Sequence, residues 1–303
     1  MQAAGITGPA LTCIQMTGGR HIQQVAELIP QLLPEQNHVF HQILRKIESG
    51  NVAFCFLDSP GGTGKTFLLN LLLMSIRKDQ KIAVAVASCG IAATLLKGDR
   101  AAHSVLKLPL SLAQEDSPIC NFCKNRSRSR MLRQCKLLAW DEGTVSHKKS
   151  YRSVKPNSSG FARQHRSYGR NGSFIGRDFR QTLPVIRRGT PADEIKACLK
   201  LSSLWEKVEK FRLKTNMRVH FRNDVDSGNY TETLLKIGDG CLDTAAEGCI
   251  LLSEEFCNLV ENDAELIAKV YQHFQQKLNS DHWLCARVIL APTNEIVNKN
   301  QQH

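Results

Sequence analysis

The sequence lacks any long apolar run. No stretch approaches the about eighteen uninterrupted apolar residues that a membrane-spanning helix needs. Residues 1–20 also lack a basic segment followed by a continuous apolar segment, so we expect no secretory signal. The 11 cysteines are odd in number and scattered, which favours a reducing compartment over a disulfide-stabilised secreted fold. We therefore expect neither a transmembrane segment nor a disulfide framework.

Acidic residues are scarce in one part of the chain. Between Ser117 and Arg177, fourteen lysines and arginines stand against only Asp141 and Glu142, so this window alone carries a formal net charge of +12. A basic block suits a polyanionic partner, of which nucleic acid is the usual one, and the alternative is a solvated loop. Residues 150–173 contain six serines and no Leu, Ile or Met, which predicts a linker or a disordered segment because so little can be buried.

Apolar residues occur in runs that alternate between strand and helix patterns. Three short runs predict strands buried on both faces of a parallel sheet: VAFCFLD at 52–58, KIAVAVAS at 81–88 and KLLAWDE at 136–142. The segments TFLLNLLLMSIRKD and GIAATLLKG follow the first two runs and predict helices. This alternation is typical of an α/β fold that binds ligands at the C-terminal ends of its strands. Further along, residues 193–211 predict a helix and residues 286–291 predict another buried strand.

The segment DSPGGTGKT, residues 58–66, has the spacing of a Walker A phosphate loop. Backbone N–H groups of such a loop surround phosphate oxygens at a helix N-terminus, and here they would come from Gly61, Gly62, Thr63 and Gly64. Lys65 would reach the β- and γ-phosphates, and the Thr66 hydroxyl would ligate Mg²⁺. Ser59 stands where the pattern has its first glycine, and it would carry about 1–2 kcal/mol of strain if that position needs a positive φ.

Two carboxylates, Asp141 and Glu142, end the third predicted strand. Asp141 can hold Mg²⁺ through its water shell, and Glu142 can orient and deprotonate the water that attacks a γ-phosphate. A kinase needs no such water-activating group, so the pair favours hydrolysis over phosphoryl transfer to a substrate. We therefore predict ATP as the substrate and Mg²⁺ as the cofactor, with Lys65, Thr66, Asp141 and Glu142 converging at one rim of the sheet.

Six segments of the sequence together resemble one family. In chain order they are LPEQNHVFHQIL (33–44), DSPGGTGKTFLLN (58–70), AVASCGIAATLLKGDRAAHSVLKLPL (85–110), KLLAWDEG (136–143), DFRQTLPVIRRGTPADEI (178–195) and LKTNMRVH (213–220). The chain resembles a Pif1-like DNA helicase of superfamily 1, in particular the type associated with Helitron transposable elements. The resemblance covers most of residues 30–303, except about 143–177.

The resemblance implies a domain organisation. After an N-terminal extension at 1–28, residues 29–210 would form a RecA-like P-loop NTPase lobe with a parallel sheet. Residues 211–303 would form the truncated start of a second RecA-like lobe. The family's later second-lobe motifs do not follow in this sequence, so we expect a fragment that binds ATP weakly, hydrolyses little of it and does not separate DNA strands by itself.

The resemblance also implies roles for residues outside the phosphate loop. Gln36 matches a glutamine that reads adenine, and Gln181 matches a γ-phosphate sensor. Arg218 matches an arginine that reaches the γ-phosphate from the second lobe and stabilises the transition state. Gly90–Thr94 and His103–Ser104 match motifs along a track for single-stranded DNA.

The function that the resemblance implies is ATP-dependent translocation on single-stranded DNA in the 5′-to-3′ direction. Its family roles are DNA repair, recombination and telomere maintenance, which would place the protein in the nucleus. One alternative is a catalytically inactive nucleic-acid-binding remnant of a transposable element. Another is a phosphate-loop ATPase that acts on protein substrates, against which the segment DFRQTLPVI argues.

One region departs from the family pattern. The family has a central strand that runs into Gly-Asp-Phe, whereas here a polar stretch precedes Asp178 and Arg177 occupies the position of the glycine. We therefore expect residues 143–177 to be disrupted, basic and disordered. Our hypothesis for the cause is a pair of compensating frameshifts, which translating the underlying nucleotides in the other two frames would test.

Overall fold

The computed structural model describes residues 18–50, 54–95, 100–109, 131–132, 134–154, 172–222, 225–242, 249–250, 252, 256–291 and 296. The chain divides into two compact units, Met1–Gly240 and Cys241–His303. The boundary that we expected between residues 210 and 211 falls inside the first unit, within strand β6 (Glu209–Arg212). Of the expected N-terminal extension, residues 1–17 lie outside the described residues.

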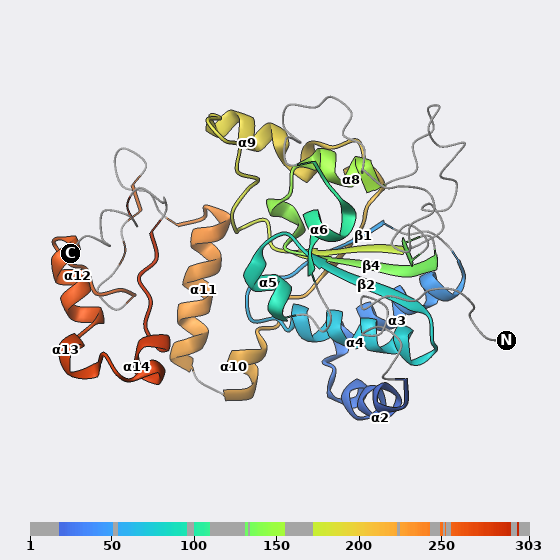
Figure 1. The fold of residues 1–303 in the computed structure, drawn as a ribbon, viewed down its shortest axis with the longest axis horizontal. Helices are drawn as coiled ribbons and strands as arrows, with labels where there is room; N and C mark the ends of the chain where they lie inside the picture. The colour runs from blue at the N-terminus through green and yellow to red at the C-terminus, as the bar shows by residue number, and fades with distance from the viewer. Residues whose placement is uncertain are drawn as a thin grey trace. The chain divides into compact units, whose positions relative to one another are not determined.

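The first unit is built on a six-stranded sheet in which every described pairing is parallel. The strands lie side by side in the order β3-β2-β4-β5-β1-β6, with helices above and below the sheet (Figure 1). Their bounds are β1 Phe54–Asp58, β2 Ile82–Ala87, β3 Arg100–Ala101, β4 Cys135–Asp141, β5 Gly172–Arg177 and β6 Glu209–Arg212. The strands predicted at 52–58, 81–88 and 136–142 are confirmed as β1, β2 and β4.

Alternating side chains of β1 enter two separate hydrophobic cores. Cys55 and Leu57 are buried in one core, and Phe56 is buried in the other. Successive side chains of a strand point to opposite faces of the sheet, so a strand covered on both faces must be apolar throughout. This double burial explains why β1, β2 and β4 read as almost continuous apolar runs.

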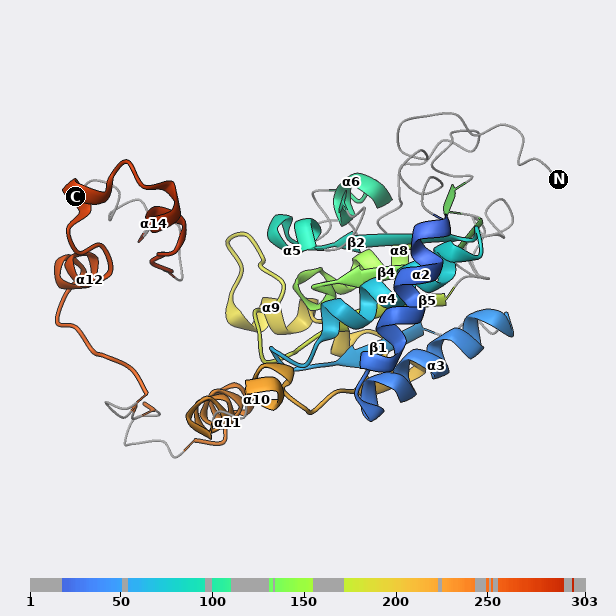
Figure 2. The ribbon, with the colours of Figure 1, turned by 90° about the horizontal axis from the view of Figure 1, so that it is seen from below.

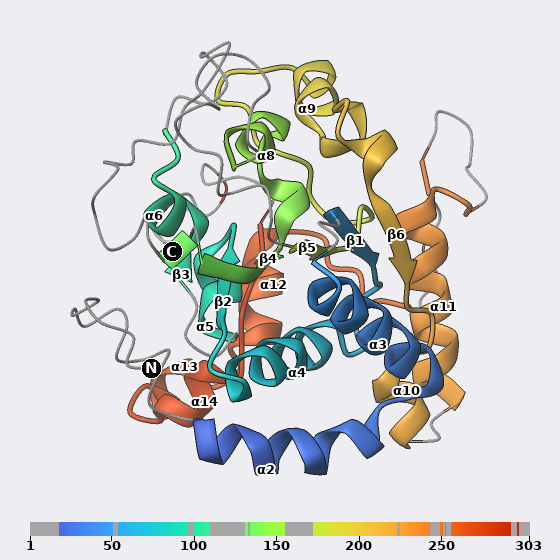
Figure 3. The ribbon, with the colours of Figure 1, turned by 90° about the vertical axis from the view of Figure 1, so that its right-hand side faces the viewer.

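Three helices cover one face of the sheet (Figure 3). Helix α4 (Lys65–Lys78) lies directly against the strands, and its five leucines are fully buried. Helices α2 (Gly18–Leu28) and α3 (Pro34–Glu48) pack on α4 (Figure 2), where Val25 and Phe40 join the same core. Because α4 is enclosed between the sheet and two helices, it is apolar on most sides, as its sequence predicts.

The opposite face is covered by shorter elements. Trp140 of β4 and Tyr151 of α8 are buried there with ring centroids 4.8 Å apart. The remaining elements of this unit are η1 Ile29–Gln31, α5 Gly90–Leu95, α6 Ala102–Leu106, η2 Gly143–Val145, α8 Lys148–Val154, α9 Pro191–Ala197, η5 Leu199–Leu201, η6 Trp205–Lys207, α10 Met217–Arg222 and α11 Val225–Asp239.

The segment that we expected to be disrupted contains a central strand. Strand β5 pairs with β1 on one side and with β4 on the other, with Ser173 opposite both Phe54 and Leu138. Residues 143–154 also form η2 and α8. The expectation of disorder is therefore wrong for 143–154 and 172–177, while residues 155–171 lie outside the described residues. Backbone hydrogen bonds on both edges stabilise a strand independently of its side chains. A prediction based on residue composition does not take these backbone hydrogen bonds into account.

Two further expectations are corrected. Residues 193–211 do not form one helix, because α9 ends at Ala197 and two 3₁₀ turns and β6 follow. Residues 286–291 form neither a strand nor a helix. The described elements of the second unit are α12 Asp263–Val270, α13 Phe274–Lys277 and α14 Asp281–Cys285. Among the helices of the described residues, none is both long and apolar enough to cross a membrane.

Candidate functional site

The glycine loop joins the end of β1 to the start of α4. Gly62 and Gly64 have φ angles of +86° and +79°, which side chains other than glycine rarely adopt. A side chain would also have no room at either position. A Cβ on Gly62 would lie 2.6 Å from Asn216 Oδ1, and one on Gly64 would lie 2.6 Å from Gln36 Nε2. These two positions therefore require glycine for both reasons, whereas Gly61 has neither a positive φ nor a close neighbour.

Ser59, at the position of the missing glycine, carries no left-handed backbone strain. It is buried, and its φ is not positive. The strain that we considered for a serine at this position is thus absent. Its hydroxyl has no hydrogen-bond partner among the described residues, so any cost of the serine comes from burying a polar group.

Lys65 lies between the two carboxylates that end β4. Its Nζ is 2.7 Å from Asp141 Oδ1 and 2.9 Å from Glu142 Oε1. The side chains of Lys65 and Asp141 are 13% and 2% exposed, so the pair interacts with little screening by water. Thr66 follows in the first turn of α4 and is half-buried. The structure thus brings the lysine and the acidic pair together at the C-terminal rim of the sheet.

Glu142 has an unusual backbone conformation. Its φ and ψ angles are 52° and 34°, in the left-handed region, which costs a non-glycine residue about 1–2 kcal/mol. Two contacts hold this turn in place: the Glu142 N–H donates to Asp141 Oδ1, and the Tyr151 hydroxyl donates to the carbonyl of Gly143. Strain of this kind persists where the surrounding structure fixes it, and it occurs frequently at functional sites.

A short chain of hydrogen bonds joins the end of β2 to β4. Trp140 Nε1 donates to Ser88 Oγ at 2.8 Å, and Ser88 Oγ lies 2.8 Å from Ser146 Oγ. The Ser88 N–H donates to the carbonyl of Asp141. The position of the acidic pair is therefore tied to the segment that enters α5.

Gln36 is fully buried beneath the glycine loop. Its Nε2 donates to the carbonyl of Thr63 at 2.9 Å, and its Oε1 accepts a hydrogen bond from the Leu33 N–H at 3.1 Å. The Thr63 hydroxyl donates in turn to the carbonyl of Pro60. Gln36 thus supports the loop from the N-terminal turn of α3.

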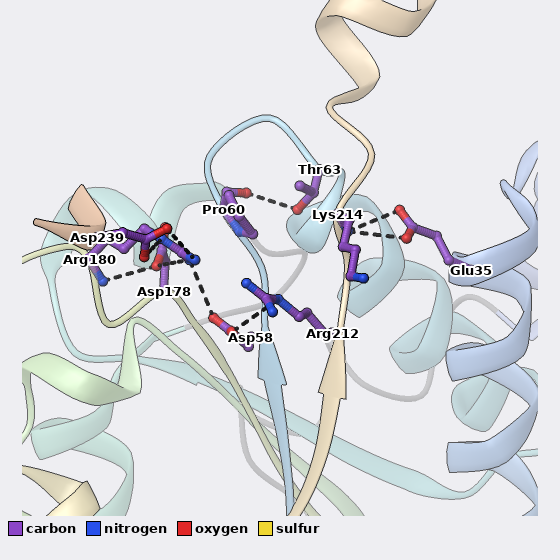
Figure 4. Close-up of polar contacts among 9 residues, drawn as sticks. All are labelled: Glu35, Asp58, Pro60, Thr63, Asp178, Arg180, Arg212, Lys214 and Asp239. Carbon is purple, nitrogen blue, oxygen red and sulfur yellow. Dashed lines mark hydrogen bonds and ion pairs between the residues drawn. The ribbon is translucent and has the colours of Figure 1, made fainter. Parts of the chain in front are cut away.

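The segment before α10 lies against the loop and the start of α3 (Figure 4). The Glu35 carboxylate accepts hydrogen bonds from the N–H groups of Lys214 and Thr215 at 2.8–3.2 Å. Immediately after, the Met217 N–H donates to the carbonyl of Gly62 at 2.8 Å. Arg218 is the next residue of α10, and only its backbone belongs to the described part of the structure.

Gln181 lies in a turn that begins at Asp178, just after β5. The Gln181 N–H donates to the carbonyl of Asp178 at 3.3 Å, and the Gln181 side chain is exposed. Asp178 is 4% exposed and accepts hydrogen bonds from both the backbone and the side chain of Arg180. Gln181 and Lys65 follow neighbouring parallel strands, β5 and β1, at the same rim of the sheet.

Asp58 ends β1 at this rim. Desolvation by burial raises the pKa of its carboxyl group above the ordinary value of 3.8, and the nearby Arg180 and Arg212 oppose this rise. Arg180 Nη1 and Arg212 Nε lie 3.8 Å and 3.6 Å from the two carboxylate oxygens. Asp58 is therefore held between two cations immediately before the glycine loop.

The segments expected to lie along a DNA track also follow strands that end at this rim. Gly90–Thr94 form most of α5 after β2, and His103–Ser104 lie in α6 after β3. Within α5, the side chain of Ala92 is buried and that of Ile91 is 79% exposed. These segments thus lie at the same rim as the glycine loop, with strands β4 and β5 between β2 and β1.

Three residues of this rim were not expected from the sequence: Glu35, Asn216 and Arg180. Each stands inside a quoted segment, and Glu35 directly precedes Gln36. Their residue types alone carry no signal, because an exposed helix or loop often contains Glu, Asn or Arg. Only the spatial approach of residues distant in sequence shows that they contact the loop or its neighbours.

The chain is similar to known proteins over most of its length. A model of the PIF1-like helicase family matches residues 31–248. The ATP-dependent DNA helicase PIF1 of Candida albicans is 25% identical over 253 residues, which are 78% of this chain and 26% of that protein. The chain thus spans well under half of the length of the curated relative.

Solved structures support the fold. The crystal structure of Pif1 helicase from Candida albicans matches with a TM-score of 0.53 and 24% identity, over 69% of this chain and 44% of that one. The structure of Pif1 helicase from Bacteroides in complex with ADP-AlF3 and ssDNA matches with a TM-score of 0.50 and 18% identity, over 80% and 56%. The predicted α/β fold with a RecA-like parallel sheet is confirmed. Because the family model matches more than half of the chain, the protein belongs to the PIF1-like helicase family.

Proposed function

We propose that the first unit binds ATP at the glycine loop and hydrolyses it, as the ATPase part of a DNA helicase. The observation that carries this proposal is the placement of Lys65 between Asp141 and Glu142 at the C-terminal rim of a parallel sheet. An ammonium and two carboxylates beside a loop of backbone N–H groups are among the components that phosphoryl transfer to water uses.

In the proposed mechanism, the triphosphate competes with the carboxylates for Lys65. The ammonium group moves from Asp141 and Glu142 to the β- and γ-phosphates, because the phosphates carry more negative charge than the carboxylates. The phosphates are also held in place by hydrogen bonds from N–H groups of the loop and of the first turn of α4. This movement frees the Glu142 carboxylate to orient a water molecule and accept its proton. Gln181 would sense the γ-phosphate, and Arg218 would stabilise the charge of the transition state. Gln36, which supports Thr63, would also contact adenine once the nucleotide is bound.

The donor set at this rim fits Mg²⁺. Thr66 and Asp141 would hold the ion, Asp141 through a water molecule, and the ion would neutralise charge on the phosphates. Magnesium usually takes one or two protein carboxylates and completes its shell with water and phosphate.

We further propose that single-stranded DNA passes over Gly90–Thr94 and His103–Ser104. Small side chains and backbone N–H groups suit contacts with phosphates. Translocation in the 5′-to-3′ direction and roles in DNA repair, recombination and telomere maintenance in the nucleus are family properties that we extend to this chain. The basic window that contains Lys148 and Lys149 would add nonspecific affinity that weakens with salt.

The test is ATP turnover by the purified chain with and without single-stranded DNA. The expected result is hydrolysis that DNA stimulates and that Lys65→Ala and Glu142→Gln both abolish. Glu142→Gln should still bind a fluorescent ATP analogue, whereas Lys65→Ala should not. A matched control is Lys81→Gln, because the Lys81 side chain lies at the surface, where it pairs with Asp79.

The outcomes separate the alternatives. DNA binding without turnover would indicate a catalytically inactive nucleic-acid-binding remnant. Turnover that DNA does not affect would indicate a phosphate-loop ATPase with another kind of substrate. The absence of nucleotide binding by the wild-type chain would overturn the proposal.

A further inference from the structure

Arg180 is the centre of a second charge cluster at the rim of the sheet (Figure 4). Its Nε and Nη2 lie 2.7 Å and 3.3 Å from the two carboxylate oxygens of Asp239. Its Nη1 lies 3.1 Å from Asp178 Oδ1 and 3.8 Å from Asp58 Oδ1. The side chain of Arg180 is only 15% exposed, so three carboxylates share one largely buried guanidinium group.

The three carboxylates come from three different parts of the fold. Asp58 ends β1 and directly precedes the glycine loop, while Asp178 directly follows β5. Asp239 is the last residue of α11, close in sequence to the end of the first unit at Gly240. Arg180 therefore joins the start of the phosphate loop, the turn that carries Gln181 and the end of α11.

The end of α11 presses closely against Arg180. A Cβ on Gly238 would lie 2.9 Å from Arg180 Cβ and 3.1 Å from Arg180 Cδ. A side chain at position 238 would thus require a shift of the arginine, which its own hydrogen bonds resist. Tight packing and a two-point pairing with Asp239 together fix the orientation of this end of the helix.

Helix α10, which precedes α11 in the chain, contacts the glycine loop. The Met217 N–H donates to the carbonyl of Gly62, and α10 packs against α11. The stretch 217–239 is therefore attached to the proposed nucleotide site at both ends, through Gly62 at its start and through Arg180 at its finish. A shift of the loop would act on the attachment through Gly62, and a shift of the Gln181 turn would act on the attachment through Arg180.

We propose that Arg180 is a positioning residue, which fixes the end of α11 to the sheet rim so that nucleotide binding and the position of α11 depend on each other. The coupling rests on the proposed nucleotide site, whereas the attachment of α11 by Arg180 does not. Arg180 acts through Asp239, Asp178 and the adjacent Gln181, without touching the nucleotide itself.

The experiment is hydrogen–deuterium exchange of the purified chain, followed in peptides from 225–240. The variants are Asp239→Asn, Arg180→Gln and Arg180→Lys. Lys236→Gln is the matched control, because Lys236 lies on the same helix in an exposed pair with Glu232. Each variant is measured free and with a non-hydrolysable ATP analogue, whose affinity is measured separately by fluorescence.

In the free protein, Asp239→Asn should speed exchange at the end of α11 by about two- to fivefold, the effect of a half-exposed ion pair. Lys236→Gln should not. Arg180→Lys should fall between the wild type and Arg180→Gln, because an ammonium restores the charge without the two-point geometry. Equal exchange in Asp239→Asn and Lys236→Gln would overturn the attachment of α11, whatever the nucleotide does.

With nucleotide, exchange in 225–240 should slow in the wild type and in Lys236→Gln, and this response should be lost in Asp239→Asn. A wild-type chain that binds the analogue without any change in α11 would overturn the coupling and leave the proposed function standing. A wild-type chain that binds no analogue would overturn the proposed function and the coupling with it, while the result for the free protein would still decide the role of Arg180.

Discussion

Two charge clusters lie at the same rim of the sheet, and they are built differently. In the first, Lys65 is a single ammonium between Asp141 and Glu142. In the second, Arg180 uses three nitrogens of a planar guanidinium to bind Asp178 and Asp239. An ammonium on a flexible stem can change partners, whereas a planar group paired at several points keeps its geometry. The first cluster suits exchange with a ligand, and the second suits permanent attachment.

The largest effect should come from Lys65→Ala. The substitution leaves Asp141, which is 2% exposed, beside Glu142 without a cation. We expect the free energy of unfolding to fall by about 3 kcal/mol, since breaking a buried pair leaves an uncompensated charge, and nucleotide binding to be lost. Urea titration and a fluorescent ATP analogue measure the two effects. A stable variant that still binds nucleotide would contradict the exchange of partners by Lys65.

The second cluster should respond unequally to the loss of its members. Arg180→Met leaves the buried Asp178 carboxylate with its backbone hydrogen bond but without a cation, and should cost about 2 kcal/mol. Asp239→Asn should cost less than about 1 kcal/mol, because Asp239 is 45% exposed and solvent screens its pairing. Urea titration of both variants tests the ranking. Equal losses would mean that the buried carboxylate does not dominate this cluster.

Glu142 allows charge and backbone strain to be separated. Both Glu142→Gln and Glu142→Asn remove the carboxylate and should abolish turnover. Asparagine tolerates the left-handed region better than glutamine, so Glu142→Asn should be the more stable of the two by about 0.5–1 kcal/mol. Thermal unfolding of the pair measures this difference. If glutamine is the more stable, the strain at φ 52° is not what limits the turn.

The smallest effect concerns Asp58, whose pKa is raised by burial. A carboxyl group that binds its proton more tightly in the fold contributes stability that is fully present below the unfolded value of 3.8 and is lost as pH rises through the raised pKa. Asp58→Asn should remove this pH dependence and change stability at pH 7 by less than about 1 kcal/mol. The control is Asp79→Asn, a carboxylate in an exposed pair. A pH profile of unfolding that Asp58→Asn leaves unchanged would contradict this reading.

Much of the first unit follows from its sequence, for reasons visible in particular residues. Strand β1 and helix α4 are each covered by other elements on more than one side, so most of their side chains are apolar. Their burial can therefore be predicted from the residue types alone. Strand β5 was missed because GSFIGR contains few apolar residues, while backbone hydrogen bonds to β1 and β4 form regardless. Residues 193–211 were misread because apolar spacing alone does not reveal where a helix ends.

The candidate site divides in the same way. Lys65 and the acidic pair could be placed together because parallel strands end at a common rim, which sequence order alone implies. The contacts made by Glu35, Asn216 and Arg180 could not, because each joins residues far apart in the chain. The deep burial of Gln36 beneath Thr63 also depends on how α3 packs, which its amphipathic pattern does not specify.

Glu35 and Gln36 are adjacent in the first turn of α3, yet one binds the N–H groups of Lys214 and Thr215 and the other binds Thr63. Neighbouring side chains on a helix diverge by about 100°. The start of α3 therefore holds the segment at 214–215 and the glycine loop at Thr63 in fixed directions relative to each other. Removing one residue from α3 after this pair would rotate both side chains by about 100° relative to the packed remainder of the helix, so both contacts would be lost together.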